Sequence, residues 1–216
     1  LSKEEIEKER YIIQDGVRTI GNCVFRGCNS LTNITIPNSV TTIDEWAFAN
    51  CKSLIDITIS DSVTHIGCSA FYNTPFIEGF TDDFIILGNC LYKYQGEGTN
   101  IDIPDSVTSI GDFAFYDCKS LKSIIIPDSV ISIGEGAFEG CIFLTNVTIP
   151  NSVTYIGDYA FRDCISLDNI TIPNSVTTIG NGAFWNCTSL ANVTIPNNVI
   201  FLGSSAFNGC KSLKRV

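Results

Sequence analysis

The sequence has no methionine, a single histidine and few basic residues: 13 Lys and Arg stand against 23 Asp and Glu, a formal net charge of −10. An acidic chain is poorly suited to nucleic acid, because a phosphate backbone is neutralised by Lys and Arg. It is equally poorly suited to an anionic membrane surface. No run of 18 apolar residues occurs, so we expect no membrane-spanning helix. Nucleic acid and direct membrane insertion are therefore excluded as binding modes.

Catalytic motifs are also missing. The sequence contains no His-Glu-x-x-His, no P-loop and no Gly-x-Gly-x-x-Gly. A Ser-His-Asp triad would need His65, which occupies a position filled by Thr, Ser or Tyr in the equivalent stretches described below. We therefore predict that the chain is not an enzyme and needs no cofactor or metal.

The chain begins with a charged stretch and not with a secretion signal. Residues 1–10 are rich in Glu and Lys, and the last residues, 211–216, stop within a repeating pattern. We expect a piece or mature form of a longer protein, from which a signal or anchor has been removed. The predicted organisation is a charged N-terminal segment over 1–10, followed by one domain over 11–216.

A 23-residue period runs through this domain. Isoleucine, valine and glycine columns keep the same spacing as the phenylalanines, and all lapse together once, between Phe71 and Phe115. Such a fixed period is the signature of a repeat architecture, in which each unit buries its sides against its neighbours. The phenylalanine column comprises Phe25, Phe48, Phe71, Phe115, Phe138, Phe161, Phe184 and Phe207.

The repeat over residues 167–187 shows how one coil is built. Ile170 and Ile172 alternate with polar residues, as on a strand with one buried face. Pro173 ends the strand because it has no N–H to donate. Gly180 is expected to permit a tight or left-handed bend, followed by one short helical turn. The prediction is an α/β solenoid of about eight 23-residue coils with a parallel β-sheet.

The repeat resembles the BspA-like leucine-rich repeats, whose pattern is L-x-x-I-x-I-P-x-S-V-x-x-I-G-x-x-A-F-x-x-C. Residues 144–164 and 167–187 match it at nearly every position, and the resemblance covers roughly residues 11–216. It implies a leucine-rich-repeat solenoid. It also implies a secreted or cell-surface microbial protein, because several members are adhesins for host matrix proteins such as fibronectin and fibrinogen. The local departures from the pattern are Val24, Asp44, Ser60 and Thr74.

Ten cysteines occur, but their spacing argues against disulfides. Stacked neighbours in one column have parallel Cβ directions, whereas a disulfide needs Cβ atoms that point at each other. We interpret the column as buried thiols that act as small hydrophobic residues; the alternative is a metal array, which needs convergent ligands. The column comprises Cys28, Cys51, Cys118, Cys141, Cys164, Cys187 and Cys210, and the outliers are Cys23, Cys68 and Cys90.

Residues 72–100 interrupt the pattern. Residues 84–87 and 90–94 flank Gly88-Asn89, which predicts a β-hairpin. One interpretation is a degenerate coil that packs its aromatic residues onto its neighbours. The other is a protruding hairpin that presents Tyr92 and Tyr94 to a partner, because exposed aromatic residues suit interface cores.

The residues between the buried strand isoleucines are expected to form a flat, polar outer face. This face is either plain solvated sheet or an extended recognition surface, as in many repeat arrays. Its candidate binding residues are Asn33, Thr35, Asp56, Thr58, Asn146, Thr148, Asn169, Thr171, Asn192 and Thr194.

Acidic residues also recur, after the glycine column and in the turn after the strand. Stacked carboxylates are potential calcium ligands, but capping and turn formation explain them better. These residues are Asp112, Glu135, Asp158, Asp105 and Asp128.

The sequence thus favours an extracellular or cell-surface adhesion module that binds a host matrix protein or a glycan through an extended repeat surface. The alternative is a structural spacer that holds another domain away from the cell surface and binds nothing.

Overall fold

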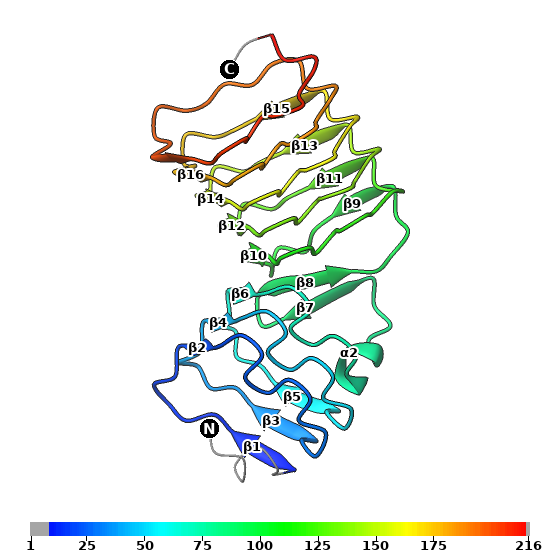
Figure 1. Ribbon diagram of the computed structural model, residues 1–216, viewed down its shortest axis with the longest axis vertical. Coiled ribbons are helices and arrows are strands. Elements are labelled where there is room, and N and C mark those ends of the chain that lie inside the picture. Colours follow the sequence, from blue (N-terminus) through cyan, green and yellow to red (C-terminus); the bar gives the residue numbers. More distant parts are fainter. Residues whose placement is uncertain (1–8, 215–216) are drawn as a thin grey trace. The chain divides into compact units, whose positions relative to one another are not determined.

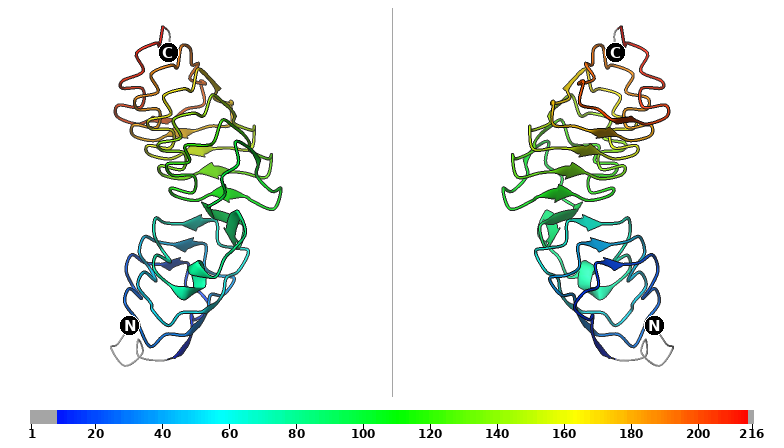
Figure 2. Two further views of the ribbon diagram at one scale, coloured as in Figure 1. Left: turned by 90° about the vertical axis from the view of Figure 1, so that its right-hand side faces the viewer. Right: turned by 90° about the vertical axis from the view of Figure 1, so that its left-hand side faces the viewer.

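The computed structural model describes residues 9–214, and the predicted charged segment 1–10 lies mostly outside this range. The chain forms two compact units, Leu1–Cys90 and Leu91–Val216, and the boundary falls inside the interrupted segment. Each unit is a stack of coils, and most coils contribute one strand to each of two sheets (Figures 1 and 2). No helix within residues 9–214 has the length and apolar character needed to cross a membrane.

In the first unit, the predicted strands pair in register at the 23-residue period. Arg10 faces Asn33, which faces Asp56, so the sequence repeat and the sheet register coincide. One sheet consists of β1 (Arg10–Ile12), β3 (Asn33–Thr35) and β5 (Asp56–Thr58), and the other of β2 (Thr19–Ile20), β4 (Thr42–Ile43) and β6 (His65–Ile66).

The second unit repeats this plan over more coils. Asn100, Ser123, Asn146 and Asn169 follow one another in the same register. The first sheet consists of β9 (Asn100–Asp102), β11 (Ser123–Ile125), β13 (Asn146–Thr148) and β15 (Asn169–Thr171). The second contains β8 (Cys90–Tyr94), β10 (Ser109–Ile110), β12 (Ser132–Ile133), β14 (Tyr155–Ile156), β16 (Thr178–Ile179) and β17 (Phe201–Leu202).

The fold is therefore a β-solenoid of about eight coils. The α/β class predicted from the sequence needs a minor correction, because the described coils contain almost no helix. In the described residues the single helix is α2 (Pro75–Glu78), in the interrupted segment. The expected helical turn after each glycine is instead a pair of hydrogen-bonded turns, with Ala183 N–H donating to Gly180 O and Trp185 N–H to Gly182 O. The left-handed residues are Gly182 and Asn186, whose φ values of 56° and 58° break the helical course.

Phenylalanine rings form the centre of both cores. The rings of Phe138, Phe161 and Phe184 are fully buried and stack with centroids 5.1 and 5.3 Å apart. The rings of the neighbouring coils thus cover both faces of Phe161, and aromatic pairs favour such stacking.

Gly180 allows the close approach of two coils. It does not adopt the left-handed conformation that the sequence led us to expect. A Cβ atom at this position would lie 2.5 Å from the carbonyl carbon of Gly157 in the preceding coil, and closer still to the Asp158 nitrogen. Real Cβ atoms do not approach backbone so closely, so a side chain at this position would force the two coils apart. The same close approach occurs at Gly134, Gly157 and Gly203, whereas the column position in the second coil is occupied by Asp44.

All ten cysteines are free thiols, which agrees with the interpretation of the seven-residue column as unpaired. Those of the column are not only small hydrophobic residues, because they also donate hydrogen bonds across the stack: Cys164 Sγ lies 3.2 Å from Phe138 O and Cys187 Sγ 3.1 Å from Phe161 O. Burial raises the pKa of the Cys51 thiol to about 11. Thr74 stands in the cysteine column but bonds within its own coil: its buried hydroxyl donates to Phe71 O at 2.8 Å and accepts from Ile77 N–H, which caps α2.

We expect only Cys23 to react quickly with a thiol reagent in the native protein. It is exposed, whereas the other nine cysteines are buried or half-buried, which limits access of the reagent. Burial raises the pKa of Cys51 and Cys164, so these thiols stay protonated. Cys118 and Cys210 are half-buried, and hydrogen bonds with Cys141 and Cys187 lower their pKa, so we expect these two to react next after Cys23. Absorbance with an aromatic disulfide reagent should show one fast thiol, and all ten cysteines after denaturation. A Cys23→Ser variant should lose the fast phase; several fast thiols in that variant would contradict the buried column.

Candidate functional site

The outer face of the first sheet in the second unit is the most regular exposed surface. Asn146 faces Asn169, and Thr148 faces Thr171, on β13 and β15 (Figure 1). The next coil continues the pattern, because Asn169 forms a parallel bridge with Asn192. These five side chains are exposed, as is Thr194, whereas Val147 and Ile170 between them are buried. The structure thus brings together the predicted Asn and Thr residues of three consecutive coils.

The corresponding face of the first unit is smaller and less uniform. Thr35, Asp56 and Thr58 are exposed and Asn33 is half-buried. The Asn33 amide donates a hydrogen bond to the Asp56 carboxylate in the next coil. Ile12, which faces Thr35, is 72% exposed, so this face carries an apolar residue at its edge.

The hypothesis that Tyr92 and Tyr94 are presented to a partner is wrong. The hairpin residues do form strands β7 (Phe84–Leu87) and β8, on either side of Gly88-Asn89, but Tyr92 and Tyr94 are 8% and 5% exposed.

Tyr94 is buried because it takes the place of a phenylalanine in the core column. Its N–H donates to Ala114 O, as Phe115 N–H does to Ala137 O one coil later. Its ring stacks on Phe115 at 5.3 Å, and its hydroxyl accepts a hydrogen bond from Gly98 N–H at 2.9 Å. The interrupted segment is therefore a degenerate coil that packs its aromatic residues onto the neighbouring coils, and it is not a protruding hairpin.

The outer face of the second sheet was not anticipated from the sequence. Its strands have only two residues, too short for an alternating pattern, yet Tyr155 on β14 is 42% exposed and Ile131, just before β12, is 52% exposed. Burial raises the pKa of Tyr155, and the negative charges of Asp158, Asp112 and Glu135 raise it further. The phenol thus lies within electrostatic range of carboxylates from three coils.

Two of these carboxylates bond to the next coil, whereas the sequence led us to expect that they cap a helical turn of their own coil. Asp112 Oδ1 accepts from Glu135 N–H at 2.9 Å, and Asp158 Oδ1 accepts from Asn181 N–H at 2.7 Å. Each fixes the turn of the following coil, which explains why acidic residues recur in this column.

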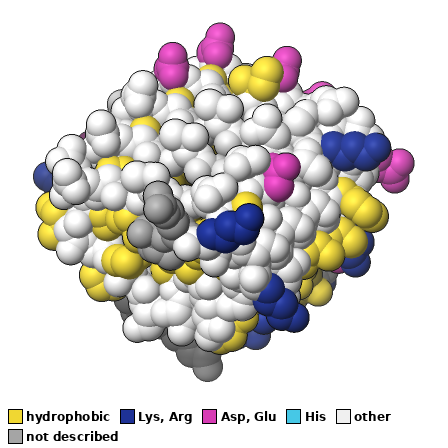
Figure 3. Space-filling view, turned by 90° about the horizontal axis from the view of Figure 1, so that it is seen from above, with side chains coloured by type: hydrophobic (Ala, Val, Ile, Leu, Met, Phe, Trp, Pro, Cys, Tyr) yellow, Lys and Arg dark blue, Asp and Glu magenta, His cyan; other side chains and the backbone are white. Residues whose placement is uncertain are grey.

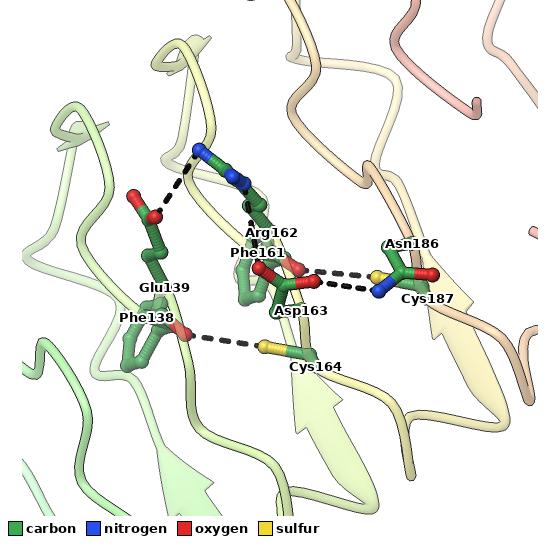
Figure 4. A network of polar contacts seen from close by, with 8 residues as sticks. All are labelled: Phe138, Glu139, Phe161, Arg162, Asp163, Cys164, Asn186 and Cys187. Carbon is green, nitrogen blue, oxygen red and sulfur yellow. Dashed lines mark hydrogen bonds and ion pairs between the residues drawn. The ribbon is translucent and has the colours of Figure 1, made fainter. Parts of the chain in front are cut away.

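A polar network runs along the neighbouring edge of the second unit (Figure 4). The Arg162 guanidinium lies 3.4 Å from both Glu139 and Asp163, and also 5.5 Å from the centroid of the Tyr159 ring. Asp163 in turn accepts a hydrogen bond from the Asn186 amide at 2.6 Å. Burial raises the pKa of Glu139, although Arg162 opposes this shift. The network ties three coils together and fixes Arg162.

Within residues 9–214, no group of three or more His, Cys, Asp or Glu side chains is arranged to hold a metal ion. His65 is exposed on β6, at the outward position expected for it. The surfaces described above offer hydrogen-bonding groups, carboxylates and a few apolar side chains, which suit non-covalent binding.

Comparison with solved structures finds bacterial leucine-rich repeat proteins. A protein from Bacteroides ovatus is 30% identical, with 95% of this chain and 62% of that protein covered and a TM-score of 0.47. A leucine rich cell surface protein from Faecalibacterium prausnitzii is also 30% identical, with 91% and 60% covered and a TM-score of 0.46. The pneumococcal vaccine antigen PcpA is 21% identical, with 85% and 56% covered and a TM-score of 0.57, and shares the fold. The chain thus spans about six tenths of the length of these three proteins.

No curated protein matches the chain. A family profile does match, the BspA type leucine rich repeat region, in six copies over residues 4–81 and 85–214. This match covers nearly the whole chain. The protein therefore belongs to the BspA-type leucine-rich repeat family.

Proposed function

We propose that the chain is a non-enzymatic binding module of a cell-surface or secreted protein, and that it adheres to a host matrix protein or a glycan. The observation that carries the proposal is the array on β13, β15 and the next coil, where identical Asn and Thr side chains are exposed in register. Nothing in the second unit's first sheet covers these side chains. Repeat proteins commonly bind along such extended surfaces.

Two further findings support this proposal. The chain belongs to a repeat family whose fold is a scaffold of stacked coils, and a protein 30% identical to it is a cell surface protein. The side chains of the array carry amide and hydroxyl groups, which pair with the backbone of a protein or with the hydroxyls of a glycan. Because the array contains no aromatic or Arg residue, we expect micromolar and not nanomolar affinity.

The proposal is tested by binding to immobilised fibronectin, fibrinogen and collagen and to a glycan array. The test variant carries Thr148→Arg, Thr171→Arg and Thr194→Arg, which place bulky charged side chains across all three coils of the array. We expect saturable binding by the native chain and at least about a tenfold loss in the variant, because a built-in clash excludes the partner.

The matched control carries Asn151→Arg, Asn174→Arg and Asn197→Arg. These residues are exposed in the turns of the same three coils, so the control adds the same charge away from the array. Equal loss in both variants would contradict binding at the array. No binding of the native chain to any target would instead favour the structural spacer.

A further inference from the structure

The second sheet of the second unit carries an exposed apolar site of its own. Tyr155 faces Ser132 across the sheet, and Ile131 is the residue before Ser132, so the two side chains come from neighbouring coils. They are 42% and 52% exposed, although most large apolar side chains of this unit are buried. Hydrophobic and acidic side chains both reach the surface at the C-terminal end of the chain (Figure 3). Exposed Tyr residues are typical of interface centres.

A row of three carboxylates runs beside this site. Asp112, Glu135 and Asp158 occupy the same column of three consecutive coils and are half-buried. The hydrogen bonds to Glu135 N–H and Asn181 N–H hold the outer two in fixed positions. Asp158 lies three residues after Tyr155, and Glu135 lies three residues after Ser132, which faces Tyr155. Burial raises the pKa of Tyr155, and the negative charges of the three carboxylates raise it further. The row is therefore pre-organised, and its charges lie alongside the apolar site.

We propose that this surface, formed by Ile131, Tyr155, Asp112, Glu135 and Asp158, docks a basic, extended segment of a partner protein. Arginine matches it best, because the guanidinium binds carboxylates in a bidentate manner and stacks on aromatic rings. The aliphatic part of the Arg side chain covers apolar surface such as Ile131. Three coils span roughly 10 Å, about the length of three extended residues. The site differs from the Asn/Thr array and does not depend on the function proposed for it.

The charge of the chain supports a basic partner. The formal net charge is −10, so cationic segments are attracted to it and nucleic acid is repelled. General attraction would act on any acidic part of the surface, whereas the proposed site requires the carboxylate row and Tyr155 together. This difference makes the proposal testable.

The test uses fluorescence anisotropy with a fluorescein-labelled short peptide of alternating arginine and leucine, added to the full chain. The test variant is Glu135→Gln with Asp158→Asn, which removes two charges and keeps an oxygen at position 158 to accept the Asn181 N–H. We expect its affinity to fall about tenfold, since two ion pairs with the arginines of the peptide are lost. Tyr155→Ser should lower the affinity about threefold, and added salt should weaken native binding.

The matched control is Asp105→Asn with Asp128→Asn. Both residues are exposed in turns after the first strand, and the control has the same net charge as the test variant. We expect its affinity to stay within about twofold of the native chain. An equal loss in the control, or no binding of the peptide by the native chain, would overturn the proposal. Thermal melts confirm that all variants are folded before the affinities are compared.

Discussion

Replacing Gly180 with alanine is expected to lower the free energy of unfolding by about 3 kcal/mol or more. The added Cβ would lie 2.4 Å from the Asp158 nitrogen and 2.5 Å from the Gly157 carbonyl carbon, which are backbone atoms that cannot rotate away, and 2.5 Å from Asp158 Oδ1. The two coils would have to separate along their hydrogen-bonded turns, including the bond from Gly180 N–H to Ile156 O. Chemical denaturation followed by circular dichroism measures the change.

Gly21 provides the matched control. It occupies the same column in the first coil, but a Cβ atom there would meet nothing within 4 Å. We expect Gly21→Ala to be neutral or to stabilise by about 0.5 kcal/mol, because alanine restricts the unfolded chain. Similar losses in both variants would show that the glycine column serves backbone conformation and not close packing.

Phe161→Ala is the second substitution with a large expected effect, a loss of about 3–5 kcal/mol. The ring is fully buried and stacks on Phe138 and Phe184 at 5.1 and 5.3 Å, so its removal leaves a cavity bounded by two rings. Phe143 in the adjacent coil is 53% exposed. Phe143→Ala should therefore change stability by no more than about 0.5 kcal/mol. An unchanged denaturation midpoint for Phe161→Ala would contradict the assigned register.

The 23-residue period predicted the buried core because residues 23 positions apart occupy the same place in successive coils and therefore have the same surroundings. Phe161, Ile170 and Val176 recur at 23-residue intervals, and all are buried as expected. The outward Asn and Thr residues followed from the same alternation. The second sheet escaped prediction because two-residue strands such as Tyr155–Ile156 contain no alternation to detect.

The two tyrosines were misjudged for a different reason. Tyr94 fills the phenylalanine column, yet it lies 21 residues before Phe115 and so falls outside the 23-residue spacing. Nothing in the sequence indicated the left-handed backbone at Phe113 and Tyr159. Their φ values are 56° and 54°, a region that bulky residues rarely adopt. Packing offsets this strain, since the Tyr159 ring lies over Gly182, where a Cβ would come within 2.6 Å of it. Such pairs depend on three-dimensional contact between coils.

The identity of successive coils has a consequence for adhesion itself. A partner that recognises one Asn/Thr pair, such as Asn169 and Thr171, finds equivalent pairs one coil away on either side. It can bind in three registers of nearly equal energy, which raises the apparent association constant about threefold and lets the partner shift along the array without leaving it. Loss of one pair removes only a third of these registers. Point mutations on such a surface should therefore weaken the proposed attachment gradually.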